Sequence, residues 1–94
     1  MNNYNEELFK EKAELLKALA HPVRLCIVKG LLENGGCNVT HMQNCLNAPQ
    51  STISQHLQKL RSLGIIKGER NGLEINYTVA NPLVGKLVEA LFKE

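Results

Sequence analysis

Three residues with metal-binding and redox-active side chains recur at intervals of four near the middle of the chain. They are Cys37, His41 and Cys45. Residues four and eight apart align on one face of a helix, and thiolates and imidazoles are good ligands for soft or borderline metals. Because Cys37 follows a Gly-Gly pair, we expect it to precede the helix that bears the other two. A metal site and a thiol redox site therefore both stay open at this point.

The spacing of the cysteines limits which disulfides are feasible. If Cys37 and Cys45 shared one helix, their α-carbons would lie about 12 Å apart, whereas a disulfide needs them within about 7 Å. A bridge would thus require Cys37 to lie outside the helix and to turn toward Cys45. The third cysteine, Cys26, stands between two apolar residues, and we expect it to be a small buried core residue. The candidate sensor thiols are Cys26, Cys37 and Cys45.

Catalytic chemistry has little support in this sequence. The chain contains no Asp, which rules out a Ser-His-Asp triad, and its glycines are scattered at turns rather than gathered in a phosphate-binding loop. His21 stands at a helix boundary beside a proline, and His56 lies in a polar helix, each without an acid or nucleophile partner. We therefore expect no enzymatic activity and no cofactor.

The start of the chain and its cysteines suggest a compartment. The first residues lack the basic start and apolar stretch of a secretory signal, and no apolar run approaches the roughly 20 residues that cross a bilayer. The three cysteines are odd in number and irregularly spaced. We expect a cytoplasmic protein with reduced thiols and no membrane span.

A length of 94 residues suits one domain, which we expect to span residues 1–94. Apolar periodicity and boundary residues predict helices at 6–20, 22–32, 39–46 and 50–63. Two strands at 65–70 and 73–79 flank an Asn71-Gly72 turn, and a last helix covers 81–93. The predicted fold is mainly helical with one β-hairpin, in the order α-α-α-α-β-β-α.

The helix at residues 50–63 has the features of a DNA-recognition helix. A short helix, a three-residue connection, this helix and a hairpin follow one another as in a winged helix-turn-helix. Residues 50–70 contain four basic residues against Glu69 alone, although the whole chain has a net charge of only +2. Hydroxyl and amide side chains in the first turns suit base edges, and basic residues on the same surface suit phosphates. The candidate DNA-binding residues are Gln50, Ser51, Thr52, Ser54 and Gln55, followed by Lys59, Arg61, Lys67 and Arg70.

Three segments resemble the ArsR/SmtB family of winged-helix bacterial repressors, and specifically its members without metal ligands. They are residues 15–25 (LLKALAHPVRL), residues 50–61 (QSTISQHLQKLR), and residues 64–66 followed by Asn71-Gly72 and Tyr77. The resemblance covers nearly the whole chain and implies a homodimer that binds operator DNA. By the family pattern, the recognition-helix contacts are Gln50, Ser51, Ser54 and Gln55, and the wing contacts are Lys67, Arg70 and Asn71.

The same resemblance argues against the family's usual sensor sites. Family metal sites on the third helix use a Cys-x-Cys arrangement, where this chain has Asn38 and Thr40. The other family metal site needs His, Asp or Glu pairs on the last helix, and residues 81–94 contain no His, Asp or Cys. Redox members pair a second-helix cysteine with one near the last helix, and Cys26 has no such partner. We therefore expect no metal cofactor.

The two terminal helices predict the dimer independently of the resemblance. A chain this short has limited capacity to bury two strongly apolar terminal helices, and packing them against a second copy would remove the exposed patch. The alternative is that both helices only close the monomer's own core. The expected interface consists of residues 6–20 and 81–93, with Leu8, Leu15, Leu87, Leu91 and Phe92 as its apolar contacts.

The function best supported by these patterns is a sequence-specific DNA-binding regulator. We expect a dimeric repressor that acts on inverted-repeat operators. One alternative is a thiol- or metal-responsive sensor repressor of the same family. Another is a winged-helix protein-interaction module that has lost DNA binding, which the modest net charge leaves open.

Overall fold

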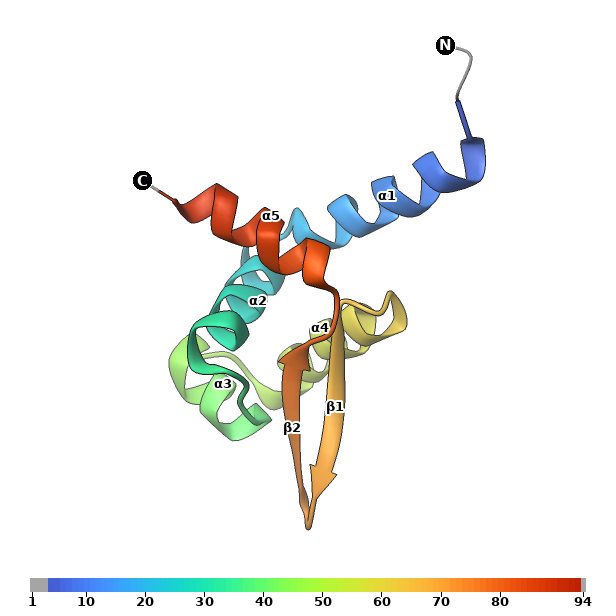
Figure 1. Ribbon diagram of the computed structural model, residues 1–94. Coiled ribbons are helices and arrows are strands. Elements are labelled where there is room, and N and C mark those ends of the chain that lie inside the picture. The colour runs from blue at the N-terminus through green and yellow to red at the C-terminus, as the bar shows by residue number, and fades with distance from the viewer. Residues whose placement is uncertain (1–3, 94) are drawn as a thin grey trace.

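The computed structural model describes residues 4–93 and confirms a mainly helical winged helix-turn-helix fold in the predicted element order (Figure 1). The elements are α1 (Glu6–Leu19), α2 (Pro22–Asn34), α3 (Val39–Leu46), α4 (Gln50–Ser62), β1 (Ile66–Asn71), β2 (Glu74–Val79) and α5 (Pro82–Phe92). The boundaries of α3 are the predicted ones, and the other helices differ from the prediction by one or two residues at their ends.

The helix starts are stabilised by polar side chains that precede the first turn. Four helices begin after a residue whose side chain accepts a hydrogen bond from a backbone amide of the first turn. Such a bond satisfies one of the amides that lack an intrahelical partner. α2 and α5 also have proline in the first turn, which costs no hydrogen bond there. The capping residues are Asn5, His21, Asn38 and Asn81.

The hairpin turn lies one residue later than predicted. Asn71 and Glu74 form the last residue pair of the two strands. The two turn residues are therefore Gly72 and Leu73 rather than Asn71 and Gly72. Gly72 has a φ of 69°, which glycine adopts without steric cost at the first turn position. Each strand accordingly begins one residue later than the alternation pattern indicated.

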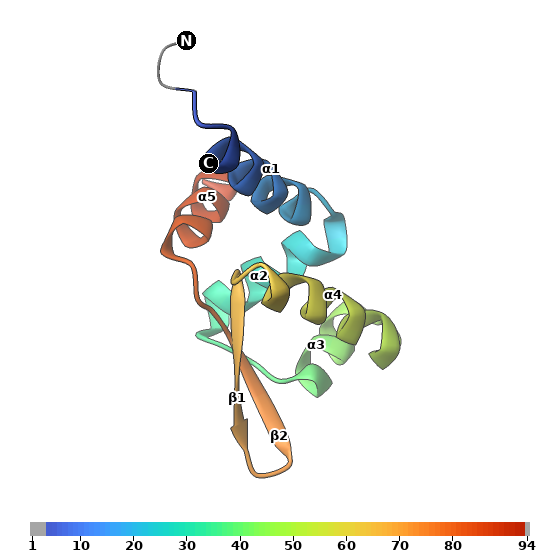
Figure 2. The same ribbon diagram turned by 90° about the vertical axis from the view of Figure 1, so that its right-hand side faces the viewer.

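The core consists mainly of aliphatic side chains from α1, α2, α4, the segment that enters β1, and α5. Its fully buried members include Val28, Ile53, Leu60, Ile65 and Val84. In both views the hairpin extends away from the helices, while α1 and α5 lie at the opposite end of the molecule from its tip (Figures 1 and 2). The fold therefore separates the hairpin and the start of α4 from the two terminal helices.

The link between α2 and α3 generates a stability prediction from two adjacent glycines. Gly36 has a φ of 122°, and a Cβ atom there would lie 2.9 Å from Thr78 Cγ2 and 3.0 Å from the Tyr77 carbonyl oxygen. Gly35 has a φ of 70°, and no atom lies within 4 Å of its virtual Cβ. We expect Gly35→Ala to cost about 1 kcal/mol of unfolding free energy and Gly36→Ala about 3 kcal/mol.

Urea unfolding followed by far-ultraviolet circular dichroism measures both values on matched substitutions. Equal losses for the two variants would show that the close approach of the hairpin to Gly36 does not contribute.

Candidate nucleic-acid interface

The turn that precedes α4 sets the direction of the helix. Asn47 ends α3 in the left-handed conformation with a φ of 51°, and its amide donates to the Gln43 carbonyl oxygen at 2.9 Å. Asn tolerates this conformation better than most residues because its short polar side chain interacts locally. Pro49, the residue that precedes α4, has extended backbone geometry. The sharp reversal presents the first turns of α4 at the surface.

α4 is anchored by one apolar stripe. Ile53, Leu57 and Leu60 are each at most 2 % exposed. At about 100° per residue this stripe directs the intervening side chains outward. Of the candidate residues on α4, only Thr52 is half-buried, and the exposed ones are Gln50, Ser51, Ser54, Gln55, Lys59 and Arg61.

The polar and basic candidates on α4 occupy different parts of the helix. Gln50, Ser51 and Ser54 lie in the first turns, whereas Lys59 and Arg61 lie in the last. At 1.5 Å per residue, Lys59 is about 13 Å farther along the axis than Gln50. Lys59 and Arg61 would therefore meet a different part of a duplex from the one that the first turns face.

The wing does not present its candidate residues on a single face. Lys67 pairs with Thr78, Arg70 with Ile75 and Asn71 with Glu74. Side chains alternate along a strand, so Lys67 and Asn71 project from one face of the hairpin and Arg70 from the other. All three are exposed, and Lys67 Nζ lies 3.8 Å from Glu69 Oε1. The expectation that the four basic residues share one surface is therefore wrong, because the odd separation of 67 and 70 places them on opposite faces.

Polar residues at the start of α3 were missed by the sequence analysis. Asn38 and Thr40 line a groove with Gln50 and the wing residue Glu74. Asn38 Nδ2 donates to Glu74 Oε2 at 3.3 Å, which ties the start of α3 to the hairpin. Only the proximity of α3 to the wing reveals this groove.

The N-terminus of α4 differs from those of the other helices. Within residues 4–93, α4 is the one α-helix whose first turn receives no side-chain cap, because Pro49 has no polar group to offer. The first amides of a helix and its dipole favour an anion. The start of α4 is therefore suited to a phosphate group.

A histidine pair connects α4 to the junction between α1 and α2. The rings of His21 and His56 have centroids 4.6 Å apart, and His21 Nδ1 accepts a hydrogen bond from the Val23 amide. The pKa of His56 lies below its ordinary value of 6.5, first because of burial and then because of His21 and Arg24. The structure therefore favours the neutral form of His56.

The exposure of one cysteine differs from the expectation. Cys26 is exposed and not a buried core residue, because Ile27 and Leu31 occupy the inward face of α2 and Cys26 lies on the far side. Cys37 lies outside α3, as expected, and pairs with Tyr77 as an isolated bridge. Among the residues that the structure describes, no three His, Cys or Glu side chains converge to hold a metal ion.

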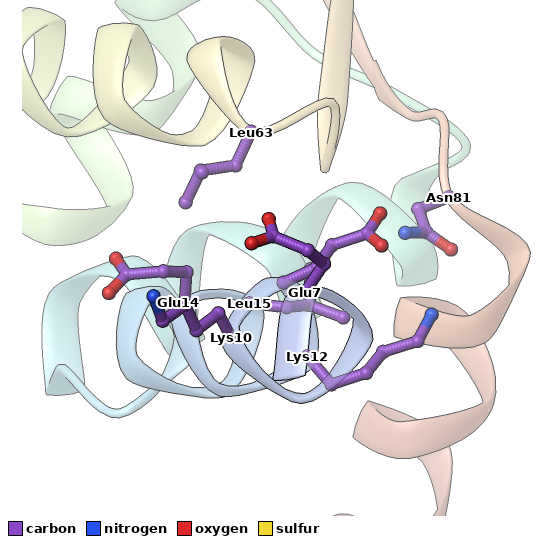
Figure 3. Close-up of a pocket in the computed structure, with 8 residues that line it drawn as sticks. Glu7, Lys10, Lys12, Glu14, Leu15, Leu63 and Asn81 are labelled. Carbon is purple, nitrogen blue, oxygen red and sulfur yellow. The ribbon is translucent and has the colours of Figure 1, made fainter. Parts of the chain in front are cut away.

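A second groove lies away from the start of α4, between α1 and the end of α4 (Figure 3). Leu63 points toward α1 from one side, and Asn81 lies on the other side of the groove, near α5. Along α1 the acidic residues of this groove outnumber the basic ones, which disfavours an approaching phosphate backbone. The charged groove residues are Glu7, Lys10, Glu11, Lys12 and Glu14.

None of the helices formed by residues 4–93 combines the length and apolar character needed to cross a bilayer.

The sequence of this chain is similar to those of known transcriptional repressors. A family model described as a helix-turn-helix domain matches residues 19–69. The chain is 46 % identical over 82 residues to the transcriptional repressor PagR of Bacillus anthracis, covering 87 % of this chain and 82 % of PagR. It is 40 % identical over 82 residues to the HTH-type transcriptional repressor SmtB of Mycobacterium tuberculosis, covering 87 % of this chain and 60 % of SmtB.

Solved structures extend the similarity to the hairpin and the terminal helices. The crystal structure of PagR matches with a TM-score of 0.84 and 44 % identity, covering 93 % of this chain and 99 % of that one. The solution structure of a homodimeric winged helix-turn-helix DNA-binding domain from Mycobacterium bovis matches with a TM-score of 0.83 and 28 % identity, covering 97 % of this chain and 86 % of that one.

The histidine pair predicts a pH dependence of folding. Because the pKa of His56 is lowered in the folded state, the unfolded chain binds more protons as the pH falls through 6.5. The contribution of His56 to stability is therefore present above pH 6.5 and is lost as the pH falls toward the lowered pKa. Urea midpoints measured from about pH 7.5 downward should decrease less steeply in His56→Gln than in the wild type. Parallel curves for the two proteins would contradict the assignment.

Proposed function

Since this chain belongs to the ArsR/SmtB family of winged helix-turn-helix transcriptional repressors, we propose that it binds inverted-repeat operator DNA as a homodimer. In this proposal, residues 1–94 form one domain that acts in the cytoplasm, where a bacterial regulator meets DNA. The first turns of α4 enter the major groove, and the wing contacts the flanking duplex.

The observation that supports sequence recognition best is the exposed face of α4. This face offers hydroxyl and amide groups from Ser51, Ser54 and Gln55, which donate to and accept from base edges. It has no acidic residue that would repel a phosphate. The uncapped amides at the start of α4 add a phosphate contact that positions the helix. Thr52 and Gln50 flank this surface.

Basic side chains supply the sequence-independent part of the affinity in this proposal. Lys59 and Arg61 contact phosphates from the end of α4, while Lys67 and Arg70 do so from the two faces of the wing. Asn71, beside the turn, contributes a polar contact at the wing tip. Neutralised phosphates release counterions, so this part of the binding weakens as salt rises.

The homodimer is supported by apolar surface that a monomer leaves in water. Exposed large hydrophobic residues gather on the terminal helices, where Leu16 is 55 % exposed and Leu91 66 %. In a twofold-symmetric dimer, α1 and α5 of the second copy would cover this surface. The same symmetry would relate the two recognition helices by a dyad, as an inverted repeat requires. The other members of the patch are Leu8, Phe9, Leu83 and Phe92. The expectation that Leu15 contacts the second copy is wrong, because Leu15 is buried in the core of its own chain, and Leu87 is half-buried against that core.

Selection of binding sequences from a random DNA pool tests the proposal and needs no known operator. Reduced protein should enrich an inverted repeat with half-sites about one helical turn apart, or a multiple of it. A gel shift against the region upstream of its own gene gives a second test. Failure to enrich any sequence, together with no shift at low salt, would favour a protein-interaction module instead.

Substitutions on α4 and the wing should weaken DNA binding in two distinguishable ways. Ser54→Ala should cost about 1 to 3 kcal/mol on the selected operator and much less on random DNA, since it removes a base contact. Arg70→Ala should weaken binding to both DNAs alike and reduce the slope of log affinity against log salt by about 2 per dimer.

Two matched variants serve as controls for this experiment. Ser62→Ala removes a hydroxyl from the other end of α4, where it donates to the Lys59 carbonyl oxygen, and Lys12→Ala removes a positive charge from α1. Both should bind the operator as the wild type does. Identical losses for Ser54→Ala on operator and random DNA would mean that α4 does not recognise sequence.

A charge in the apolar patch should dissociate the dimer. Leu91→Glu would bury an unpaired carboxylate in the proposed interface, which is not tolerated. Leu73→Glu is the matched control, because Leu73 is fully exposed at the wing tip. Sedimentation velocity should show a monomer for Leu91→Glu and a dimer for Leu73→Glu. An intact dimer in both would exclude the terminal-helix interface.

A further inference from the structure

All three cysteines of the chain line one small pocket. The pocket has a volume of about 80 Å³ and lies between α2, α3 and the segment that joins them. Cys26 comes from α2, Cys37 from the segment before α3, and His41 and Cys45 from α3. The rest of the lining is largely apolar, so the thiols and the imidazole are its reactive groups. Cysteines separated by up to 19 positions in the sequence thus meet at one surface.

Two of these thiols differ in a way that suits successive steps of an oxidation. Cys45 is exposed, and its Sγ lies 3.7 Å from His41 Nε2, within hydrogen-bonding distance for sulfur. Cys37 is half-buried, and its pKa lies above the ordinary value of 9.0, first because of burial and then because of the nearby Cys45. Cys45 is therefore placed to react first with a solvent oxidant, and Cys37 stays a thiol.

The backbone of Cys37 is also hydrogen-bonded directly to the wing. Its amide donates to the Tyr77 carbonyl oxygen at 3.1 Å, and the Tyr77 amide donates to the Cys37 carbonyl oxygen at 2.9 Å. Tyr77 is buried in the middle of β2. The next residue, Asn38, caps α3 by accepting from the His41 amide at 2.9 Å. A displacement of Cys37 would thus disturb the hairpin and the start of α3 together.

We propose that a peroxide oxidises Cys45 and that Cys37 then closes a Cys37–Cys45 disulfide, which weakens DNA binding. The inference rests on the proposed function, since it assigns a regulatory input to that DNA-binding surface. It differs from a bridge between the second and last helices, for which this chain lacks the C-terminal cysteine.

Formation of the proposed disulfide consumes one molecule of peroxide and releases two molecules of water. The Cys45 thiolate attacks one peroxide oxygen, the O–O bond breaks, and the leaving hydroxide takes a proton to form water. The product is a sulfenic acid, in which the sulfur has lost two electrons to the peroxide. The Cys37 sulfur then attacks the Cys45 sulfur, the S–O bond breaks, and the departing hydroxide combines with the Cys37 proton as a second water.

Closing the bridge would constrain the segment that precedes α3. Residues 39–45 are helical, and six steps of 1.5 Å separate Val39 from Cys45 by about 9 Å along the axis of α3. The α-carbons of a disulfide lie within about 7 Å of each other. We therefore expect closure to draw the Cys37 segment toward α3 and away from Tyr77, or to unwind the first turn of α3. Either movement would shift the wing or the start of α3 relative to α4.

Peptide mass analysis identifies the bridge directly. Trypsin cuts after Lys29 and Lys59, so Cys37 and Cys45 share the peptide 30–59, whereas Cys26 lies in the peptide 25–29. After stoichiometric hydrogen peroxide and alkylation, the peptide 30–59 should be unalkylated and lighter than its reduced form by two hydrogens. A cross-link between the two peptides, or between two chains, would overturn the proposed pairing.

DNA binding tests the regulatory consequence. Peroxide should lower the operator affinity of the wild type and of Cys26→Ser at least tenfold, and a reducing agent should restore it. Cys37→Ala and Cys45→Ala should bind as reduced wild type does and should not respond. Reduced protein that fails to bind any DNA would refute the proposed function itself. Reduced protein that binds, and that keeps its affinity after the bridge has formed, would refute only the regulatory inference.

Discussion

The burial of Ile53, Leu57 and Leu60 is the constraint on which the proposed DNA-binding surface depends. These side chains are at most 2 % exposed, so they fix the rotation of α4 about its own axis. A rotation by one residue, about 100°, would bring polar side chains into the core without partners. The stripe therefore decides that Ser54 and Gln55 face solvent, and the rest of the fold supports that orientation. The hairpin and α3 pack around a helix whose outward face is already determined.

The sequence predicted most of the fold because local chemistry marked the element boundaries. Asn38 and Asn81 are polar caps, and the apolar spacing in α4 is uniformly helical, so local preference and tertiary packing agree there. The hairpin was predicted less well. An Asn-Gly pair fits a two-residue turn, but Asn71 instead closes the ladder opposite Glu74. The choice between these registers depends on how the strands pack, which the turn residues alone do not determine.

The candidate site was only partly predictable, because the positions of several of its residues depend on tertiary packing. Charge counting grouped Lys67 with Arg70, but strand alternation places them on opposite faces of the wing. Apolar neighbours suggested that Cys26 is buried, although helix rotation places it outside the core. Spacing along the chain links Cys37 with Cys45 but not with Cys26, which reaches the same pocket only through the packing of α2 near α3. Each of these features requires tertiary structure, which no local pattern encodes.

The connection between the terminal helices and α4 determines how the proposed dimer would present its two recognition helices. Arg24 Nε donates to the Ala18 carbonyl oxygen at 2.7 Å and joins the end of α1 to α2. At the same junction His21 caps α2 and contacts His56 on α4. The helix α1, which would supply part of the dimer surface, is thus linked through a few direct contacts to the helix that would meet the bases. Because such a connection transmits orientation with little freedom, the proposed dimer would hold a fixed half-site spacing. A change at the wing or at the start of α3 would then alter the fit of each half-site rather than the distance between them.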